Sequence, residues 1–183
     1  IISHRRINLD LMFDLETLDT SPGAVILSMG AVKFDPRKLP EIADTLYLRF
    51  DIDDQTALGR VISEETLQWW GTQPAAIQES TFSEEGRLPL EEALTQFHKF
   101  VWNSDRVWSQ GSFDTNIMEH LYKQMKRPLP WKYWQVRDSR TMFDFVDPQL
   151  DRSAHHDALE DAKAQANGVQ RVLQKMGWVG LKL

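Results

Sequence analysis

The most constraining feature of the chain is a short alternating run that ends in two acidic residues. Residues 7–13 continue into Asp14-Leu15-Glu16-Thr17. Alternation with a period of two predicts a β-strand. One face would carry Leu9, Leu11, Phe13 and Leu15, and the other Asp10, Met12, Asp14 and Glu16. The two final carboxylates, Asp14 and Glu16, should therefore project from the same side of one strand.

Two carboxylates held this close raise each other's pKa, and a divalent cation between them relieves the repulsion. Ligation by oxygen alone suits Mg²⁺ or Mn²⁺. The alternative is a strand end with two solvated acids, and Asp14 and Glu16 alone do not separate these interpretations. A metal site requires further ligands from other parts of the chain.

The rest of the pattern predicts an α/β fold. Further strands are expected at residues 24–34, 45–50, 106–110 and 133–137. Helices are expected at residues 63–71, after Pro74, and at 89–102, 113–126, 139–146 and 157–176. Three consecutive strands indicate an antiparallel meander, and the alternation of strands and helices that follows indicates parallel strands. We expect a mixed five-stranded sheet flanked by helices, in a single domain over residues 1–183.

Composition excludes several classes of protein. With 42% hydrophobic and 26% charged residues the chain is typical of globular proteins, and without cysteine it has no disulfide, thiolate metal site or cysteine nucleophile. Its longest apolar stretch, residues 23–32, is about half of a membrane span, so we expect a soluble cytoplasmic protein with no membrane partner. The net charge of −6 argues against a broad basic face for nucleic acid. It does not exclude an enzyme that grips a strand end through bound cations.

Two later segments supply candidate ligands. Asp114 lies where a strand gives way to a helix, at the edge where α/β sheets usually bind ligands, although it could equally be a helix N-cap. Asp161 faces an alanine-lined side of the last helix, and His156 precedes that helix. Asp157 is the expected N-cap of the same helix.

Together, these residues form a candidate catalytic set: Asp14, Glu16, Asp114, His156 and Asp161. Four carboxylates suit two divalent cations about 3.5–4 Å apart, the arrangement that hydrolyses phosphodiesters. The four acids are therefore the candidate metal ligands. A histidine is largely neutral, and hence basic, near pH 7, so His156 is the candidate base that takes a proton from the attacking water.

The same residues resemble a known family. Asp14-x-Glu16, Phe113-Asp114, and His156 followed five residues later by Asp161 are similar to the three motifs of the DEDDh 3′-to-5′ exonucleases, which have the ribonuclease H-like fold. Residues 14–17, 24–31, 66–70 and 133–141 look most like a phage-type branch. That branch includes the T4-like phage exonuclease A, the nuclease part of exonuclease VIII and a mycobacterial exoribonuclease.

The resemblance covers nearly the whole chain, and all five catalytic positions are present. It implies release of nucleoside 5′-monophosphates from single-stranded DNA or RNA 3′ ends. Because family members are often dimers, a homodimer is an open expectation.

Candidate substrate-binding residues are Thr17, Leu18, Trp70, Phe113 and Arg140. Thr17 and Leu18 match family positions that contact the terminal nucleotide, although Leu18 could be plain packing. Trp69 and Trp70 would point about 100° apart on a helix, so only one should stack on a base, and we favour Trp70. Phe113 belongs to the second motif, and Arg140 is a candidate for a phosphate contact or a structural ion pair.

Two alternatives remain open. A non-catalytic nucleic-acid-binding or scaffold domain could keep the same fold, although the intact carboxylates argue against it, and metal titration would separate it from an enzyme. A different ribonuclease H-like enzyme, such as an endonuclease, would cleave a circular substrate, which an exonuclease cannot do.

Overall fold

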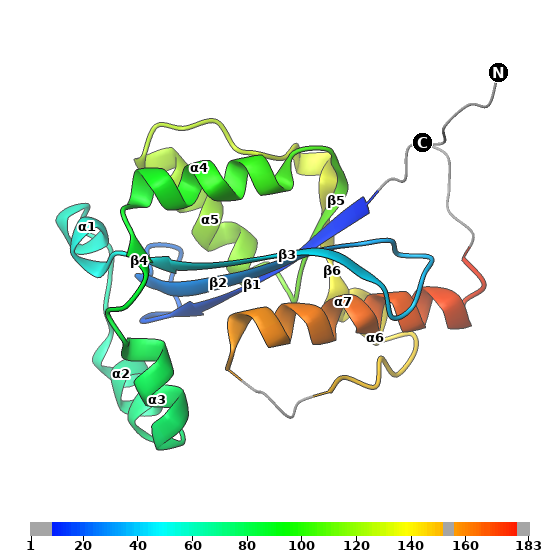
Figure 1. Ribbon diagram of the computed structural model, residues 1–183, viewed down its shortest axis with the longest axis horizontal. Helices are drawn as coiled ribbons and strands as arrows, with labels where there is room; N and C mark the ends of the chain where they lie inside the picture. Colours follow the sequence, from blue (N-terminus) through cyan, green and yellow to red (C-terminus); the bar gives the residue numbers. More distant parts are fainter. Residues whose placement is uncertain (1–8, 152–155, 179–183) are drawn as a thin grey trace.

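The computed structural model describes residues 9–151 and 156–178, which form a six-stranded mixed sheet with helices on both faces (Figure 1). The strands are β1 Leu9–Thr17, β2 Ile26–Phe34, β3 Ile42–Phe50, β4 Arg87–Leu88, β5 Ser104–Ser109 and β6 Val136–Asp138, in the spatial order β4-β3-β2-β1-β5-β6. The pairs β1–β2 and β2–β3 are antiparallel, and the other three pairs are parallel. The predicted α/β class and antiparallel meander are confirmed.

The sheet differs from the prediction at its two edges. The two-residue strand β4 was not predicted, so the sheet has six strands and not five. At the other edge β6 begins only at Val136, because Tyr133–Gln135 form the 3₁₀ helix η1. Residues 7 and 8 of the predicted first strand lie outside the described residues.

The helices are α1 Ile52–Ala57, α2 Glu64–Gly71, α3 Ala75–Phe82, α4 Leu90–Val101, α5 Phe113–Gln124, α6 Ser139–Phe143 and α7 Ala158–Lys175. Six of them lie where the sequence predicts a helix, and the short α1 was not predicted. Asp157 caps α7 as predicted, since its side chain accepts hydrogen bonds from the backbone N–H groups of Leu159 and Glu160. The cap fixes where α7 begins, which matters for the pocket that its first turn lines.

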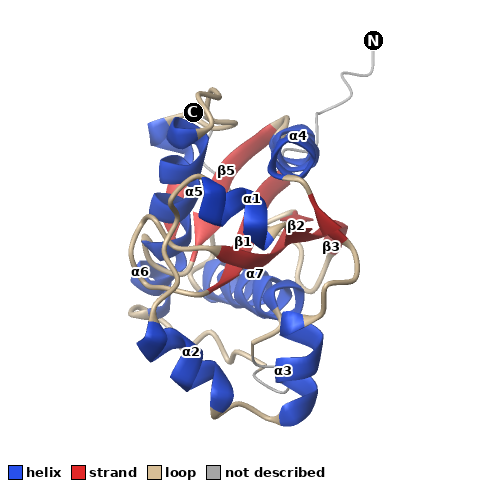
Figure 2. Ribbon diagram, turned by 90° about the vertical axis from the view of Figure 1, so that its left-hand side faces the viewer, coloured by secondary structure: helices blue, strands red, loops and turns tan. Residues whose placement is uncertain are grey.

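The alternation of β1 divides the apolar core between two layers. Leu11, Phe13 and Leu15 pack toward α4 and α5, whereas Met12 packs toward α7 on the opposite face of the sheet. Figures 1 and 2 show these helices on either side of the strands. Because side chains two positions apart share a face, Asp14 lies on the side that α7 covers.

A glycine lets the start of α7 reach the sheet. Gly30 of β2 pairs with Asp14 of β1, and a Cβ atom at Gly30 would lie 2.2 Å from the backbone of Ala158. Any side chain at Gly30 would therefore push the first turn of α7 away. The close approach brings Asp161 over the end of β1.

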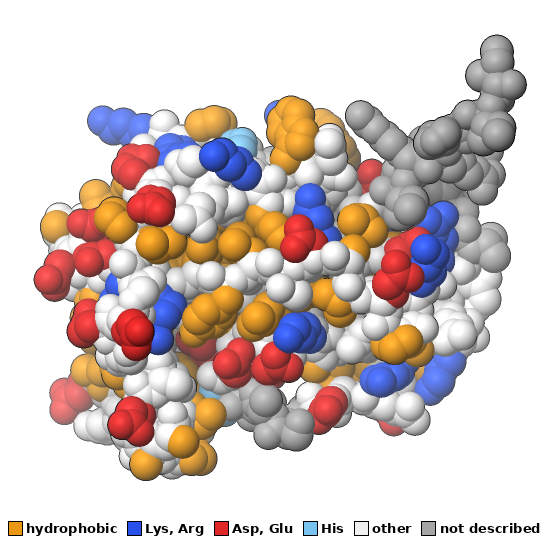
Figure 3. All heavy atoms as spheres, viewed as in Figure 1, with side chains coloured by type: hydrophobic (Ala, Val, Ile, Leu, Met, Phe, Trp, Pro, Cys, Tyr) orange, Lys and Arg blue, Asp and Glu red, His pale blue; other side chains and the backbone are white. Residues whose placement is uncertain are grey.

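A third apolar cluster packs α2 and α3 beside the end of β1. It contains the buried residues Leu18, Val25, Leu27 and Trp70. On the face seen in Figure 3, Lys and Arg side chains are interspersed with Asp and Glu side chains. No helix in the described ranges combines the length and the apolar character that crossing a membrane would require.

Candidate active site

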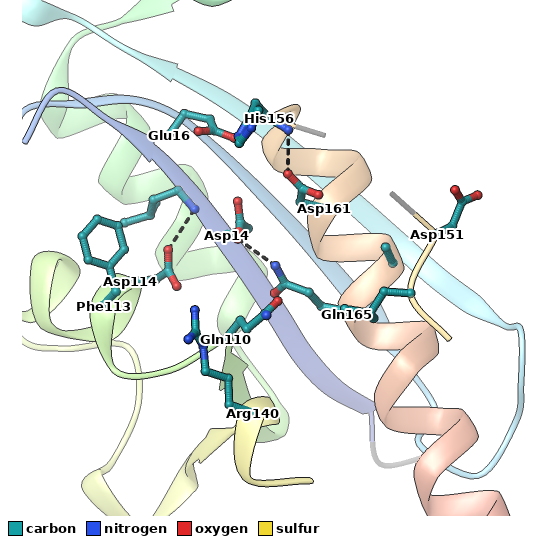
Figure 4. A pocket seen from close by; sticks show the side chains of 13 residues that line it. Asp14, Glu16, Gln110, Phe113, Asp114, Arg140, Asp151, His156, Asp161 and Gln165 are labelled. Atoms are coloured by element: carbon teal, nitrogen blue, oxygen red, sulfur yellow. Dashed lines mark hydrogen bonds between the residues drawn. The ribbon is translucent and has the colours of Figure 1, made fainter. Parts of the chain in front are cut away.

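A pocket of about 470 Å³ lies between the end of β1, the start of α5 and the first turns of α7 (Figure 4). Its lining residues are Asp14, Leu15, Glu16, Gln110, Phe113, Asp114, Arg140, Leu150, Asp151, His156, Asp161, Ala164 and Gln165. The structure thus places all five predicted catalytic residues in one pocket. Phe113 and Arg140, from the predicted substrate-binding set, line it as well.

Three of the acids form a tight cluster. Asp14, Glu16 and Asp161 each offer a carboxylate oxygen, and these oxygens lie within 4.8 Å of one another. The first two acids project from β1, and Asp161 projects from the first turn of α7. Carboxylate oxygens are the ligands that Mg²⁺ and Mn²⁺ prefer, so this donor set fits a hard divalent cation.

Asp114 is joined to the cluster through β1. Its Oδ1 accepts a hydrogen bond of 3.1 Å from the backbone N–H of Leu15, the residue between Asp14 and Glu16. The N-cap position of α5 belongs to Ser112, so Asp114 is not the cap that the sequence left open as an alternative. The hydrogen bond fixes the start of α5 against the strand that carries the acid pair.

The environment of these acids favours their protonated forms when no cation is bound. Burial raises the pKa of Asp14 well above its ordinary value, and the charges of Asp114 and Glu16 raise it further. Burial, followed by the neighbouring Asp161, raises the pKa of Glu16 to about 8. Burial also raises the pKa of Asp114, although the Leu15 N–H and the positive charge of Arg140 act in the opposite direction. A divalent cation would relieve this repulsion.

Gln165 is a functional candidate that the sequence analysis missed. Its Nε2 donates a hydrogen bond of 2.8 Å to Oδ1 of Asp14, which orients that carboxylate (Figure 4). The Oε1 of the same side chain is buried and has no hydrogen-bond partner among the described residues. The signal available in the sequence is its position four residues after Asp161, on the same face of a helix.

His156 is held by the first turn of α7 and by α2. Its backbone lies in the left-handed region, with φ at 68°, and its N–H donates a hydrogen bond of 2.9 Å to Oδ2 of Asp161. The imidazole meets the ring of Trp69 edge-on, with the ring centroids 4.9 Å apart, and the ring of Trp70 at 6.1 Å. These contacts place the imidazole at one end of the pocket, beside Glu16 (Figure 4).

The preference for Trp70 as the stacking residue is corrected by its burial. Trp70 is 1% exposed, its Nε1 donates a hydrogen bond of 2.9 Å to the carbonyl oxygen of Thr17, and its ring packs against Phe82. The neighbouring Trp69 is 43% exposed and has the accessible ring. Periodicity predicts that one of the pair is buried but does not predict which one.

Thr17 and Leu18, two of the predicted substrate-binding residues, are not among the residues that line the pocket. Both are buried, and the Thr17 hydroxyl donates a hydrogen bond of 2.8 Å to the carbonyl oxygen of Asp19. Leu18 packs with Val25 and Leu27, so the packing alternative left open for Leu18 describes what its side chain does here.

Known proteins resemble this chain in sequence and in fold. A family model described as the 3′-5′ exoribonuclease Rv2179c-like domain matches residues 9–173. No curated protein matches the chain. Cell-death related nuclease 4 (CRN-4), a solved structure, is similar with a TM-score of 0.53 and 17% identity, over 93% of this chain and 65% of that one. The chain thus spans 65% of that nuclease, and the likeness concerns the fold.

The family match covers the elements that build the pocket. Residues 9–173 run from the first residue of β1 almost to the end of α7. They contain every carboxylate of the acid cluster, together with His156 and Gln165. The chain therefore belongs to the family of Rv2179c-like 3′-5′ exoribonuclease domains.

Proposed function

We propose that this protein is a metal-dependent 3′-5′ exonuclease that releases nucleoside 5′-monophosphates from single-stranded 3′ ends. The observation that carries the proposal is the meeting of four carboxylates and one histidine, from separate segments of the chain, in one pocket. The family's description names RNA as the substrate class, and we extend it to this chain as part of the proposal.

The proposed ligands of two Mg²⁺ or Mn²⁺ ions are Asp14, Glu16, Asp114 and Asp161. The close approach of the oxygens of Asp14, Glu16 and Asp161 and the raised pKa values of Asp14, Glu16 and Asp114 support this assignment, because such a cluster is most stable when positive charge is bound. When bound, the ions supply positive charge to the phosphate and lower the pKa of water. Gln165 keeps the Asp14 carboxylate in orientation through its amide hydrogen bond.

His156 is the proposed general base. Its imidazole takes a proton from the water that attacks the last phosphate of the strand. The new oxygen–phosphorus bond forms as the bond to the 3′ oxygen of the preceding nucleotide breaks. The products are a nucleoside 5′-monophosphate and a strand shortened by one nucleotide, with a new 3′ hydroxyl. The hydrogen bond from the His156 backbone to Asp161 keeps the base next to the acid cluster.

The terminal nucleotide is proposed to lie beside the end of β1. Thr17 and Leu18 follow Glu16 there as buried residues, and Trp70 holds the backbone of Thr17 in place through its hydrogen bond to the Thr17 carbonyl oxygen. Trp69 offers an accessible ring for a base to stack on, as in sequence-tolerant single-strand binding. Phe113, which is 36% exposed, is a second ring at the pocket.

The test is a time course on single-stranded RNA and DNA of one sequence, labelled at either end, with Mg²⁺, Mn²⁺ or EDTA. We expect a metal-dependent ladder that shortens the 5′-labelled strand from its 3′ end, and a labelled 5′-mononucleotide from the 3′-labelled strand. The faster sugar identifies the substrate. Cleavage of a circular strand would indicate an endonuclease, and binding without any cleavage would indicate a non-catalytic domain.

Three narrower expectations from the sequence stay predictions: a homodimer, a cytoplasmic location and a closer relation to the phage-type branch. Light scattering of the purified protein tests the first of them.

A further inference from the structure

The two ends of the pocket have different surroundings. At the end beside Glu16 and His156, the chain continues into Thr17 and Leu18, which are 8% and 3% exposed and do not line the pocket. At the opposite end, Gln110, Arg140 and Leu150 also line a second cavity of about 650 Å³. The remaining residues around that cavity are Phe143, Asp144, Asp147, Pro148 and Gln149.

An enzyme that removes terminal nucleotides holds the 3′ terminus in its site and needs a path along which the rest of the strand can leave, and the second cavity adjoins the pocket at Gln110, Arg140 and Leu150. Resting on the exonuclease function proposed above, we propose that the strand leaves the site past Arg140 into the second cavity. Arg140 then binds the phosphate on the 5′ side of the scissile phosphate. A guanidinium suits this contact because its fork of N–H donors matches the geometry of phosphate oxygens.

The Arg140 side chain is positioned by Asp138. One carboxylate oxygen of Asp138, Oδ1, accepts hydrogen bonds of 2.8 Å from the backbone N–H groups of both Gly111 and Arg140. This ties the start of α6 to the turn that follows β5. At Gly111, where φ is 89°, a Cβ atom would lie 3.6 Å from Nε of Arg140, so the arginine side chain runs along the glycine backbone. Asp138 is therefore a positioning residue.

The Arg140 guanidinium is available to a ligand. Arg140 is exposed, and within the described ranges its guanidinium forms no hydrogen bond or ion pair. Figure 4 shows it pointing into the pocket toward Asp114. Asp144 and Asp147 line the second cavity and disfavour a phosphate deeper inside it, so the anion contact is concentrated at Arg140 and the cavity suits sugar and base groups.

Arg140 could instead act only by moderating the charge of Asp114, whose pKa it lowers. A strand with one uncharged methylphosphonate linkage separates the two roles. The linkage is placed immediately 5′ to the scissile phosphate or, as a control, three linkages further upstream. Release of the first 3′ nucleotide is measured in single turnover. Affinity for the same strands, measured by fluorescence anisotropy with Ca²⁺ in place of Mg²⁺, is a second readout that does not require hydrolysis.

For the wild type we expect the adjacent methylphosphonate to reduce the rate or affinity by about 10-fold to 100-fold, as for loss of a hydrogen bond to a charged group. The distant one should have little effect. Arg140→Gln should show a similar loss with the ordinary strand and no further loss with the adjacent methylphosphonate. Asp138→Ala should reduce the effect of the adjacent methylphosphonate on rate and affinity. Asp138→Asn should keep that effect, because the amide oxygen of asparagine can still accept the hydrogen bonds from the N–H groups of Gly111 and Arg140. Lys123→Gln, which removes an exposed charge on α5, is the matched control and should behave as the wild type.

The inference is overturned if Arg140→Gln keeps the full wild-type sensitivity, or if the wild type is insensitive to the adjacent linkage in both readouts. A wild type that shows the expected pattern in affinity but releases no nucleotide would contradict the exonuclease proposal and leave the phosphate contact supported.

Discussion

Acidic residues lie at two places on the same face of β1: Asp10 near its start, and Asp14 and Glu16 at its end. Asp10 accepts a hydrogen bond of 2.8 Å from Nε1 of Trp108 on one carboxylate oxygen and one of 3.3 Å from Arg106 on the other. At the end of the strand, Asp14 receives a hydrogen bond from Gln165. The Glu16 carboxylate accepts none from any described residue, and its charged neighbours are other acids.

The difference shows in the pKa values. Burial raises the pKa of Asp10 to about 6, and Trp108 and Arg106 oppose the increase. Burial and like charges together raise the pKa of Glu16 to about 8. Desolvating a carboxylate costs free energy at both places, but only near the start of the strand do donors of the protein offset much of that cost. The acids at the end of the strand, where like charges add to the cost of burial, are those expected to bind a cation.

The largest expected effect is the loss of hydrolysis when an acid of the cluster at the end of β1 is replaced, compared with replacement of Asp10. Asp14→Asn or Asp161→Asn should reduce hydrolysis to the background of the assay, because each removes a proposed metal ligand. Asp10→Asn, the matched change at the other end of β1, should leave the rate close to that of the wild type. Initial rates on a labelled strand, with circular dichroism to confirm folding, measure this. Near-wild-type turnover in Asp14→Asn would contradict the assignment of Asp14 as a metal ligand.

His156→Ala should reduce kcat by about 10²-fold to 10⁴-fold, the usual contribution of a general base. Stabilisation of the folded protein by divalent cations should persist, because the acid cluster remains. Single-turnover rates and thermal unfolding with Mn²⁺ test both halves of this prediction. A change in cation binding as large as the change in rate would show that His156 acts on the cluster instead of on water.

A smaller loss of activity is expected when Gln165, which donates a hydrogen bond to Asp14 of the acid cluster, is replaced. Gln165→Ala should lower activity or metal affinity by about 10-fold to 100-fold, because the hydrogen bond that orients Asp14 is lost. Gln174→Ala, an exposed glutamine on the same helix, is the control. Equal rates for the two variants would contradict a role for Gln165 in orienting the ligand.

The smallest effect concerns the stability of the metal-free protein. Because folding raises the pKa values of Glu16 and Asp10, the native state binds more protons than the unfolded state, and the free energy of unfolding falls as the pH rises. The loss runs from the unfolded pKa to about pH 8 for Glu16 and to about pH 6 for Asp10. Glu16→Gln should reduce the fall in the free energy of unfolding over the upper part of this pH range, and Asp10→Asn should reduce it over the lower part. Each reduction should be on the order of 1–3 kcal/mol. Denaturant unfolding in EDTA at several pH values measures these slopes, and unchanged slopes in both variants would contradict the assignment.

The sequence predicts the long helices and strands because an element that is buried on one face has apolar residues at a regular spacing. The alternation around Leu11 and Phe13 and the apolar stripe of α4 both predict the elements that form. The short elements α1 and β4 have no such spacing, since six and two residues are too few to show a period. Their formation depends on tertiary contacts, such as the pairing of β4 with β3.

The acids of the pocket were predictable because each lies at the end or on the inner face of an element. The roles of Trp69 and Gln165 were not. Which of the two indoles is buried depends on the hydrogen bond from Trp70 to Thr17. These two residues are 53 positions apart in the chain. Gln165 depends on the distance between α7 and β1, which Gly30 sets by admitting the backbone of Ala158.

The most direct test of the cation claim is the free energy of unfolding at pH 8, with and without Mg²⁺ or Mn²⁺, for the wild type, Asp10→Asn and Asp14→Asn. A ligand that binds only the folded state stabilises it by about 2.7 kcal/mol at one hundred times its Kd. We predict that the cation stabilises the wild type and Asp10→Asn alike and Asp14→Asn much less. No stabilisation of the wild type, or equal stabilisation of Asp14→Asn, would contradict a cation site at the end of β1.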